Sequence, residues 1–157
     1  FVGLMIDAAG TPRVIEFNVR FGDPETQSLL MRLVGDLVPL LDAAARGGLE
    51  AVAAPAWHGA AVCVVLASGG YPRDYAAGKP ITGLDAAAQD ADVVVFHAGT
   101  KRVAGGGFVT AGGRVLGVCA RGESVAEARD RAYAACGPIA FEGMHLRRDI
   151  ALRGAGA

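Results

Sequence analysis

The sequence predicts an α+β fold, in which a β-hairpin and two helices precede a small, mostly antiparallel β domain with one helix. Within residues 14–21, the side chains from Ile15 to Phe21 alternate between apolar and polar, which is typical of a half-buried strand. Residues 23–48 carry apolar residues at helical spacing. From residue 60 on, the chain reads as five or six short strands with a single capped helix near the end. This order lacks the helices that would link successive parallel strands, so we expect an antiparallel unit.

The composition indicates a globular protein with ample core material. Hydrophobic residues make up 52% of the 157 residues, and charged residues make up 20%. The net charge is −1 and Lys and Arg are dispersed, so we expect no nucleic-acid partner. No run of 18 apolar residues or signal-peptide pattern occurs, so we expect a cytoplasmic protein without membrane contact. The three cysteines show no Cys-x-x-Cys spacing and are predicted to be buried thiols of a reducing compartment.

The first predicted element is a hairpin with an unusual polar side. Residues 2–7 and 13–21 read as strands around a turn at residues 8–12. One side of the second strand carries Glu16, Asn18 and Arg20, and the other carries Ile15, Phe17, Val19 and Phe21. Carboxylate and amide oxygens are ligands for hard cations, and Arg binds anions. The pattern fits a strand that holds a metal ion and a phosphate-bearing ligand, and it fits the solvated face of an edge strand equally well.

Two helices are expected after the hairpin. Asp23 is a preferred N-cap, Pro24 suits the first helical position and Glu25 suits the positive end of the helix dipole. Residues at helical spacing form the expected buried stripes, namely Leu29, Leu30, Leu33 and Val34 in the first helix and Leu37, Leu40, Leu41 and Ala44 in the second. The second helix is expected to end at residues 47–48, a Gly-Gly pair.

The remaining elements define the second domain. We expect domains at residues 1–50 and 60–157, with a loose, Ala- and Pro-bearing linker at residues 51–59. The predicted strands are a fully buried one at residues 60–67, short ones at 81–84 and 93–97, a hairpin of 108–110 with 114–120, and a last strand within 141–150. Ser124 and Glu127 form a capping box that opens a helix to about Cys136.

Several stretches in order along the chain resemble the phosphoribosylamine–glycine ligase family, which are ATP-grasp enzymes of purine biosynthesis. The resembling stretches are residues 16–27 (Glu-Phe-Asn-Val-Arg-Phe-Gly-Asp-Pro-Glu-Thr-Gln), 64–72, 78–84, 96–100, 112–118 and 141–150. The short Glu-x-Asn-x-Arg pattern alone would indicate only the wider ATP-grasp group. The resemblance implies the end of an ATP-grasp core followed by the family's C-terminal domain. Because the chain opens at Phe1 within a strand pattern, we expect a fragment whose N-terminal partner is missing.

The resemblance also implies a reaction and roles for residues. The family joins phosphoribosylamine and glycine with ATP through an acyl phosphate, and it uses Mg²⁺ or Mn²⁺. Glu16 and Asn18 match the metal ligands, and Arg20 matches the group that steadies phosphoryl charge, with a structural ion pair as its alternative. Asp23 could orient the substrate amine or serve only as a helix cap. The chain alone is expected to be inactive.

Other interpretations stay open at this stage. A non-catalytic interaction or regulatory module derived from an ATP-grasp ligase is the main alternative, although the retained Glu16, Asn18 and Arg20 argue against it. The apolar side of the hairpin would need cover, for example in a homodimer. In the second domain, the loop at residues 68–72 and the segment at 97–101 are candidates for facing a shared cleft.

Overall fold

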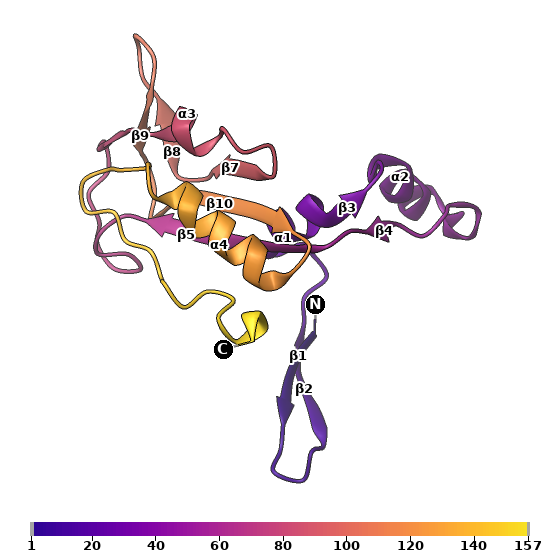
Figure 1. Cartoon of the computed structure of the whole chain (residues 1–157). Coiled ribbons are helices and arrows are strands. Elements are labelled where there is room, and N and C mark those ends of the chain that lie inside the picture. Colours follow the sequence, from indigo (N-terminus) through magenta and orange to yellow (C-terminus); the bar gives the residue numbers. More distant parts are fainter. Residues whose placement is uncertain (1, 157) are drawn as a thin grey trace.

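The main sheet is built around β10 (Arg114–Gly122), which pairs antiparallel with β5 (Ala60–Ala67) on one side and β7 (Val93–His97) on the other. The computed structural model describes residues 2–156. Figure 1 shows these three strands in the middle of the larger part of the molecule. The continuous apolar run at residues 60–67 forms the expected buried strand, with the predicted bounds.

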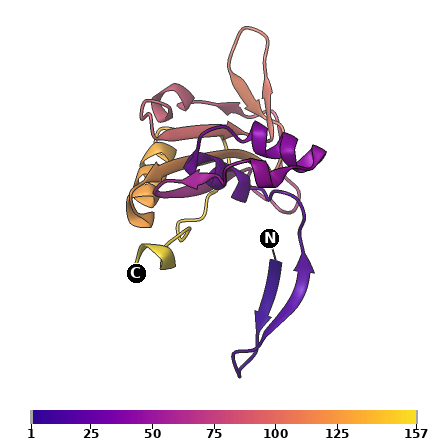
Figure 2. The ribbon, with the colours of Figure 1, turned by 90° about the vertical axis from the view of Figure 1, so that its right-hand side faces the viewer.

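Helix α4 (Val125–Cys136) covers one face of this sheet and forms the core with it. Ala128 and Ala132 of the helix are fully buried against Val64, Leu66 and Val118 of the strands. Helix α1 (Glu25–Arg32) packs against β5 and β10 from the opposite face (Figures 1 and 2). The central sheet is therefore held between α4, which buries one face against it, and the first helix of the chain.

The predicted capping box is confirmed at the start of α4. The backbone N–H of Glu127 donates to the Ser124 hydroxyl at 3.2 Å, and the Glu127 carboxylate accepts from the N–H of Glu123 at 3.0 Å. These bonds satisfy two amide groups that a helix end would otherwise leave without partners. The helix ends at Cys136, as expected from the Gly-Pro pair that follows.

A second, smaller sheet holds the short strands, in the order β6 (Pro80–Ile81), β9 (Phe108–Thr110) and β8 (Thr100–Arg102). The expected hairpin of residues 108–110 with 114–120 is wrong, because β9 and β10 belong to different sheets. The chain changes sheets where Gly99 and Gly112 meet. A Cβ added to Gly99 would lie 2.6 Å from the Gly112 Cα, so only glycine permits this crossing.

Two further expectations for this domain are corrected. The short strand expected at residues 81–84 ends at Ile81, and helix α3 (Leu84–Ala87) begins at Leu84. The strand expected within residues 141–150 is absent from the described chain, where one isolated bridge joins His145 to Ala67. Side chains of α4 anchor this segment instead, with the Tyr133 hydroxyl donating to the Arg147 carbonyl at 2.7 Å. A short 3₁₀ turn, η2 (Arg153–Ala155), follows.

The first hairpin, β1 (Val2–Ile6) with β2 (Pro12–Phe17), extends away from the sheet and helices (Figure 2). Strand β2 ends at Phe17, four residues before the predicted end, and its last described pair joins Phe17 to Val2. Asn18 and Arg20 therefore lie beyond the strand. The apolar side chains of this part of the chain are exposed, to 70% at Phe17 and 98% at Val19.

The helical region of the first predicted domain also departs from expectation. Neither α1 nor α2 (Val38–Arg46) contains a buried residue, so the expected buried stripes are wrong. Residues 33 and 34 leave the helix and form β3 (Leu33–Val34), which pairs with β4 (Ala56–Trp57). The 3₁₀ turn η1 (Leu49–Ala51) lies between them. Within residues 2–156, no helix has the length and apolar character needed to cross a membrane.

Candidate active site

The segment between β2 and α1, residues 18–24, connects the hairpin to the main sheet and lines two hollows. The larger hollow has a volume of about 910 Å³ and lies between this segment, α1, β5 and residues 150–151. The smaller one, about 400 Å³, is lined by Arg20, Phe21, Asp23, Glu25 and Arg114. Three of the four residues singled out from the sequence thus line hollows: Asn18 the larger, Asp23 the smaller, and Arg20 both.

Glu16 lies apart from these hollows, on the exposed part of β2. It pairs with Gly3 of β1, and a Cβ added to Gly3 would come within 3.1 Å of the Glu16 Cγ. Glycine at position 3 therefore gives the Glu16 side chain room beside β1. Within the described residues, no group of three or more His, Cys, Asp or Glu side chains could hold a metal ion. Glu16 and Asn18 offer one carboxylate and one amide oxygen, donors that suit Mg²⁺ when phosphates and water complete its coordination.

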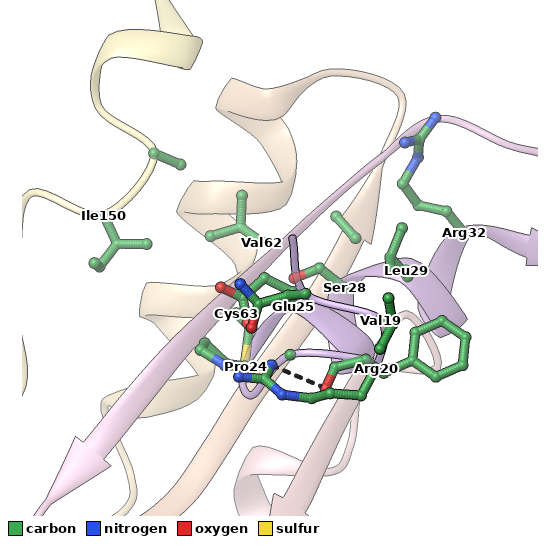
Figure 3. Close-up of a pocket in the computed structure, with 15 residues that line it drawn as sticks. Val19, Arg20, Pro24, Glu25, Ser28, Leu29, Arg32, Val62, Cys63 and Ile150 are labelled. Carbon is green, nitrogen blue, oxygen red and sulfur yellow. Dashed lines mark hydrogen bonds between the residues drawn. The ribbon is translucent and has the colours of Figure 1, made fainter. Parts of the chain in front are cut away.

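Arg20 is held by the chain around it. Its Nη1 donates to the Phe21 carbonyl at 3.2 Å, the bond drawn as a dashed line in Figure 3. The residue is exposed. The guanidinium therefore remains accessible to an anionic ligand in either hollow.

Asp23 is not the helix cap that the sequence suggested. The N-cap position of α1 is occupied by Pro24, and no side chain caps the helix. The Asp23 carboxylate accepts instead from Gln27 Nε2 at 2.8 Å and pairs with Arg114 Nη1 at 3.5 Å. The first turn begins one residue later than expected, so the short Asp23 side chain cannot serve the amides that a cap would satisfy.

Arg114 is the residue of this site that sequence reasoning missed. It begins β10, donates from Nη1 to the Asp23 carbonyl at 2.7 Å and from Nε to the Tyr71 hydroxyl at 2.9 Å. The Tyr71 hydrogen bond raises the pKa of the Arg114 guanidinium above its ordinary value, and the nearby Asp23 and Glu25 carboxylates add to the rise. The sequence indicated Arg114 only as a member of the resembling stretch at residues 112–118. Its role was not predicted, because its partners lie far away in sequence.

The two loops of the second domain have different surroundings. The loop at residues 68–72 contacts Arg114, a residue that lines the smaller hollow, through the Tyr71 hydroxyl. Ser68 anchors the loop by donating to the Gly112 carbonyl at 2.9 Å. The segment at 97–101 lies by the small sheet. His97 Nδ1 is 2.9 Å from Thr100 Oγ1, and the His97 ring lies 4.3 Å from that of Phe108.

Comparison with solved structures finds a similar fold in biotin carboxylases. The biotin carboxylase domain of Hydrogenobacter thermophilus 2-oxoglutarate carboxylase matches 92% of the chain and 32% of its own length, with a TM-score of 0.60 and 16% identity. The biotin carboxylase subunit of a pyruvate carboxylase matches with a TM-score of 0.57 and 20% identity. At such identities the likeness shows the fold alone.

The family follows from closer relatives. The family model described as phosphoribosylglycinamide synthetase, C domain, matches residues 61–153, and the chain belongs to this family. The phosphoribosylamine–glycine ligase of Phenylobacterium zucineum is 56% identical over 157 residues, which are 99% of this chain and 37% of that protein. The Caulobacter vibrioides ligase is 51% identical, over 98% of this chain and 36% of its own length.

A solved structure agrees with these relatives. The crystal structure of phosphoribosylamine–glycine ligase from Thermotoga maritima matches with a TM-score of 0.77 and 38% identity, over 94% of this chain and 35% of that one. The resemblance identified from the sequence is thereby confirmed. The chain spans about a third of the length of the relatives it matches.

Proposed function

We propose that this chain contributes part of a phosphoribosylamine–glycine ligase, an ATP-dependent carbon–nitrogen ligase. The reaction joins 5-phosphoribosylamine and glycine to give glycinamide ribonucleotide, ADP and phosphate through a glycyl phosphate. The observation that carries the proposal is the Glu16-x-Asn18-x-Arg20 pattern. Its last two members line the larger hollow, in a chain that matches such ligases over 96–99% of its length.

Glu16 and Asn18 are the proposed metal ligands. Their oxygen donors fit Mg²⁺ or Mn²⁺, and the bound ion would neutralise charge on the nucleotide phosphates. Two protein ligands suffice for such an ion, because it keeps several waters and binds substrate phosphates. The Gly3 position lets the Glu16 carboxylate lie beside the hairpin without a steric clash.

Arg20 and Asp23 are the proposed residues on the substrate side. The Arg20 guanidinium lines both hollows and would stabilise negative charge on a transferring phosphoryl group or an acyl phosphate. The Asp23 carboxylate faces the smaller hollow and would accept a hydrogen bond from the attacking amine. The hydrogen bond from Gln27 keeps that carboxylate in one orientation.

The proposal includes a requirement for further chain. Within the family, binding of adenine and most of the phosphates belongs to a part of the core outside the stretches that this chain resembles. We therefore expect weak or no binding of MgATP to the 157-residue chain in calorimetry. We also propose a cytoplasmic location, which agrees with three buried cysteines that form no disulfide.

A chimera tests the proposal directly. The chain replaces the matching 157 residues of the Phenylobacterium zucineum ligase, and production of ADP that depends on phosphoribosylamine and glycine is measured. We expect an active chimera whose kcat falls by about 100-fold or more in Glu16→Gln and Arg20→Ala, the usual weight of one transition-state contact. Glu50→Gln, on the exposed turn η1, serves as the matched control and should leave activity unchanged.

Three results would contradict parts of this assignment. An inactive chimera that is folded would favour the non-catalytic module that retained the fold and lost the chemistry. Full activity in both Glu16→Gln and Arg20→Ala would remove these residues from the reaction. Tight binding of MgATP with ligase turnover by the 157-residue chain alone would overturn the requirement for further chain.

A further inference from the structure

One arginine contacts both the segment at residues 18–24 and the loop at residues 68–72. Arg114 lies 91 residues after Asp23, yet its Nη1 donates to the Asp23 carbonyl at 2.7 Å. The same Nη1 is 3.5 Å from the Asp23 carboxylate, so the guanidinium contacts both the backbone and the side chain of this residue. A charge-assisted hydrogen bond to a backbone carbonyl fixes the position of the chain as well as that of the side chain.

The orientation of Arg114 is itself fixed from the second domain. Its Nε donates to the Tyr71 hydroxyl at 2.9 Å, and a Cβ on the neighbouring Gly113 would clash with the Tyr71 ring. Gly113 therefore leaves the space into which the tyrosine packs. The planar fork of the guanidinium then spans Tyr71 on one side and Asp23 on the other, which a lysine could not reproduce.

We propose that Arg114 is a positioning residue for the ligase reaction, which orients the segment of Arg20 and Asp23 from the second domain. The inference rests on the proposed function and extends it, because it makes the loop at residues 68–72 part of the active site's support. The charged residues that line the smaller hollow are Arg20, Asp23, Glu25 and Arg114. Without Arg114, Asp23 would lose its hydrogen bond and ion pair to the start of β10, and Arg20 would be the remaining arginine beside Asp23 and Glu25 in the lining of the smaller hollow.

The first experiment measures the segment itself, in the 157-residue chain. Hydrogen exchange of the amides in residues 22–27 is compared between the wild type and Arg114→Ala. We expect exchange there to become about tenfold faster, the weight of one lost charge-assisted hydrogen bond. Arg121→Ala is the matched control, because Arg121 lies on the same strand and pairs with Asp92 instead. It should leave the exchange of residues 22–27 unchanged.

The second experiment measures kcat and KM separately in the chimera. Arg114→Ala should lower kcat by about 100-fold, the effect of a small misplacement of reacting groups, with little change in the KM for ATP. Arg114→Lys should recover part of that loss, and Tyr71→Phe should show a smaller loss in the same direction. Adding Tyr71→Phe to Arg114→Ala should lower kcat no further, since both changes break one linkage.

The outcomes separate the two proposals. Unchanged exchange in residues 22–27 of Arg114→Ala, or an unchanged kcat, would overturn the positioning role even if the chimera is active. A fall in melting temperature with kcat preserved would likewise reduce Arg114 to a structural link. An inactive unmutated chimera would overturn the proposed function and with it the catalytic part of this inference, while the exchange result would still decide whether Arg114 holds the segment.

Discussion

Arg131 of α4 donates a hydrogen bond of 2.7 Å to the Asp92 carboxylate, which lies just before β7. The other oxygen of Asp92 accepts from Arg121 Nε at 2.6 Å. One carboxylate thus receives hydrogen bonds from the helix and from the central strand that it covers. This arrangement ties α4 to both β10 and the start of β7 at the surface of the core.

The Asp92 arrangement predicts a specific pH dependence of stability. The hydrogen bond from Arg121, with the charges of Arg121 and Arg131, lowers the pKa of Asp92 below its ordinary value. A lowered folded-state pKa gives stability that is present above the unfolded pKa, about 3.9, and is lost as the pH falls through the folded pKa. Asp92→Asn should therefore be less stable than wild type at pH 7, with the difference narrowing toward pH 3. The stability difference is measured from the urea midpoints of wild type and Asp92→Asn between pH 7 and pH 3. Asp74→Asn, in an exposed loop, is the control.

The cysteines should resist modification in the folded chain. Burial raises the pKa of the Cys136 thiol to about 12, and the hydrogen bond with Cys63, together with burial, raises the pKa of Cys119. At pH 8 so little thiolate forms at Cys119 and Cys136 that these two native thiols should react with a disulfide reagent at least about a thousandfold more slowly than in urea. Rapid native reaction of any one thiol would contradict the buried environment of that residue.

The capping box predicts a modest change in stability. Ser124→Ala removes the hydroxyl that accepts from the Glu127 amide, so the free energy of unfolding should fall by about 1 kcal/mol. Ser124→Gly should lower the free energy of unfolding by only a few tenths of a kcal/mol, because a glycine N-cap leaves the helix amides open to water. Urea denaturation measures both. Equal losses in the two variants would show that the hydroxyl does not cap the helix.

The core should be sensitive to substitution on β5 and tolerant on α2. Leu66 is fully buried in the sheet, whereas Leu41 is 49% exposed. Leu66→Ala should lower the free energy of unfolding by about 2–5 kcal/mol, and Leu41→Ala by clearly less. Urea denaturation of the two leucine variants provides the comparison. Similar losses would mean that α2 is covered in solution.

The exposed hairpin should cause self-association of the chain. Ile15 and Phe17 lie on β2 with exposures of 63% and 70%, which is unusual for large apolar side chains that are close neighbours. Ile15→Thr with Phe17→Ser should reduce concentration-dependent association in sedimentation velocity. Val103→Thr, a single exposed position elsewhere, is the control. A wild-type chain that stays monomeric at all concentrations would rule out the homodimer expected from the sequence.

The elements that sequence reasoning predicted correctly carry strong local signals. The continuous apolar run of β5 and the capping box of α4 determine these elements without reference to distant residues, and both have the predicted bounds. The cysteines are buried as expected, since their spacing fits neither a disulfide pattern nor a metal site. Glu16, Asn18 and Arg20 could be singled out because a short motif contains all three.

The errors arise where distant contacts decide the structure. The segment at residues 141–150 reads as a strand, yet Tyr133 and Arg129 hold its carbonyls with their side chains. Residues 108–110 pair with β6 and β8 rather than with β10, and no local pattern distinguishes these partners. The contact between Arg114 and Asp23 escaped notice for the same reason, since nothing near either residue indicates the other.

The position of β10 in the centre of the main sheet has a consequence for synthesis of the protein. Its neighbours β5 and β7 both precede it in the chain, and they do not pair with each other. A ribosome therefore releases two apolar strands that stay without their partner until residues 114–122 have emerged. We expect this domain to form late and in one step, and the interval before it to be the period when the growing chain most needs a chaperone.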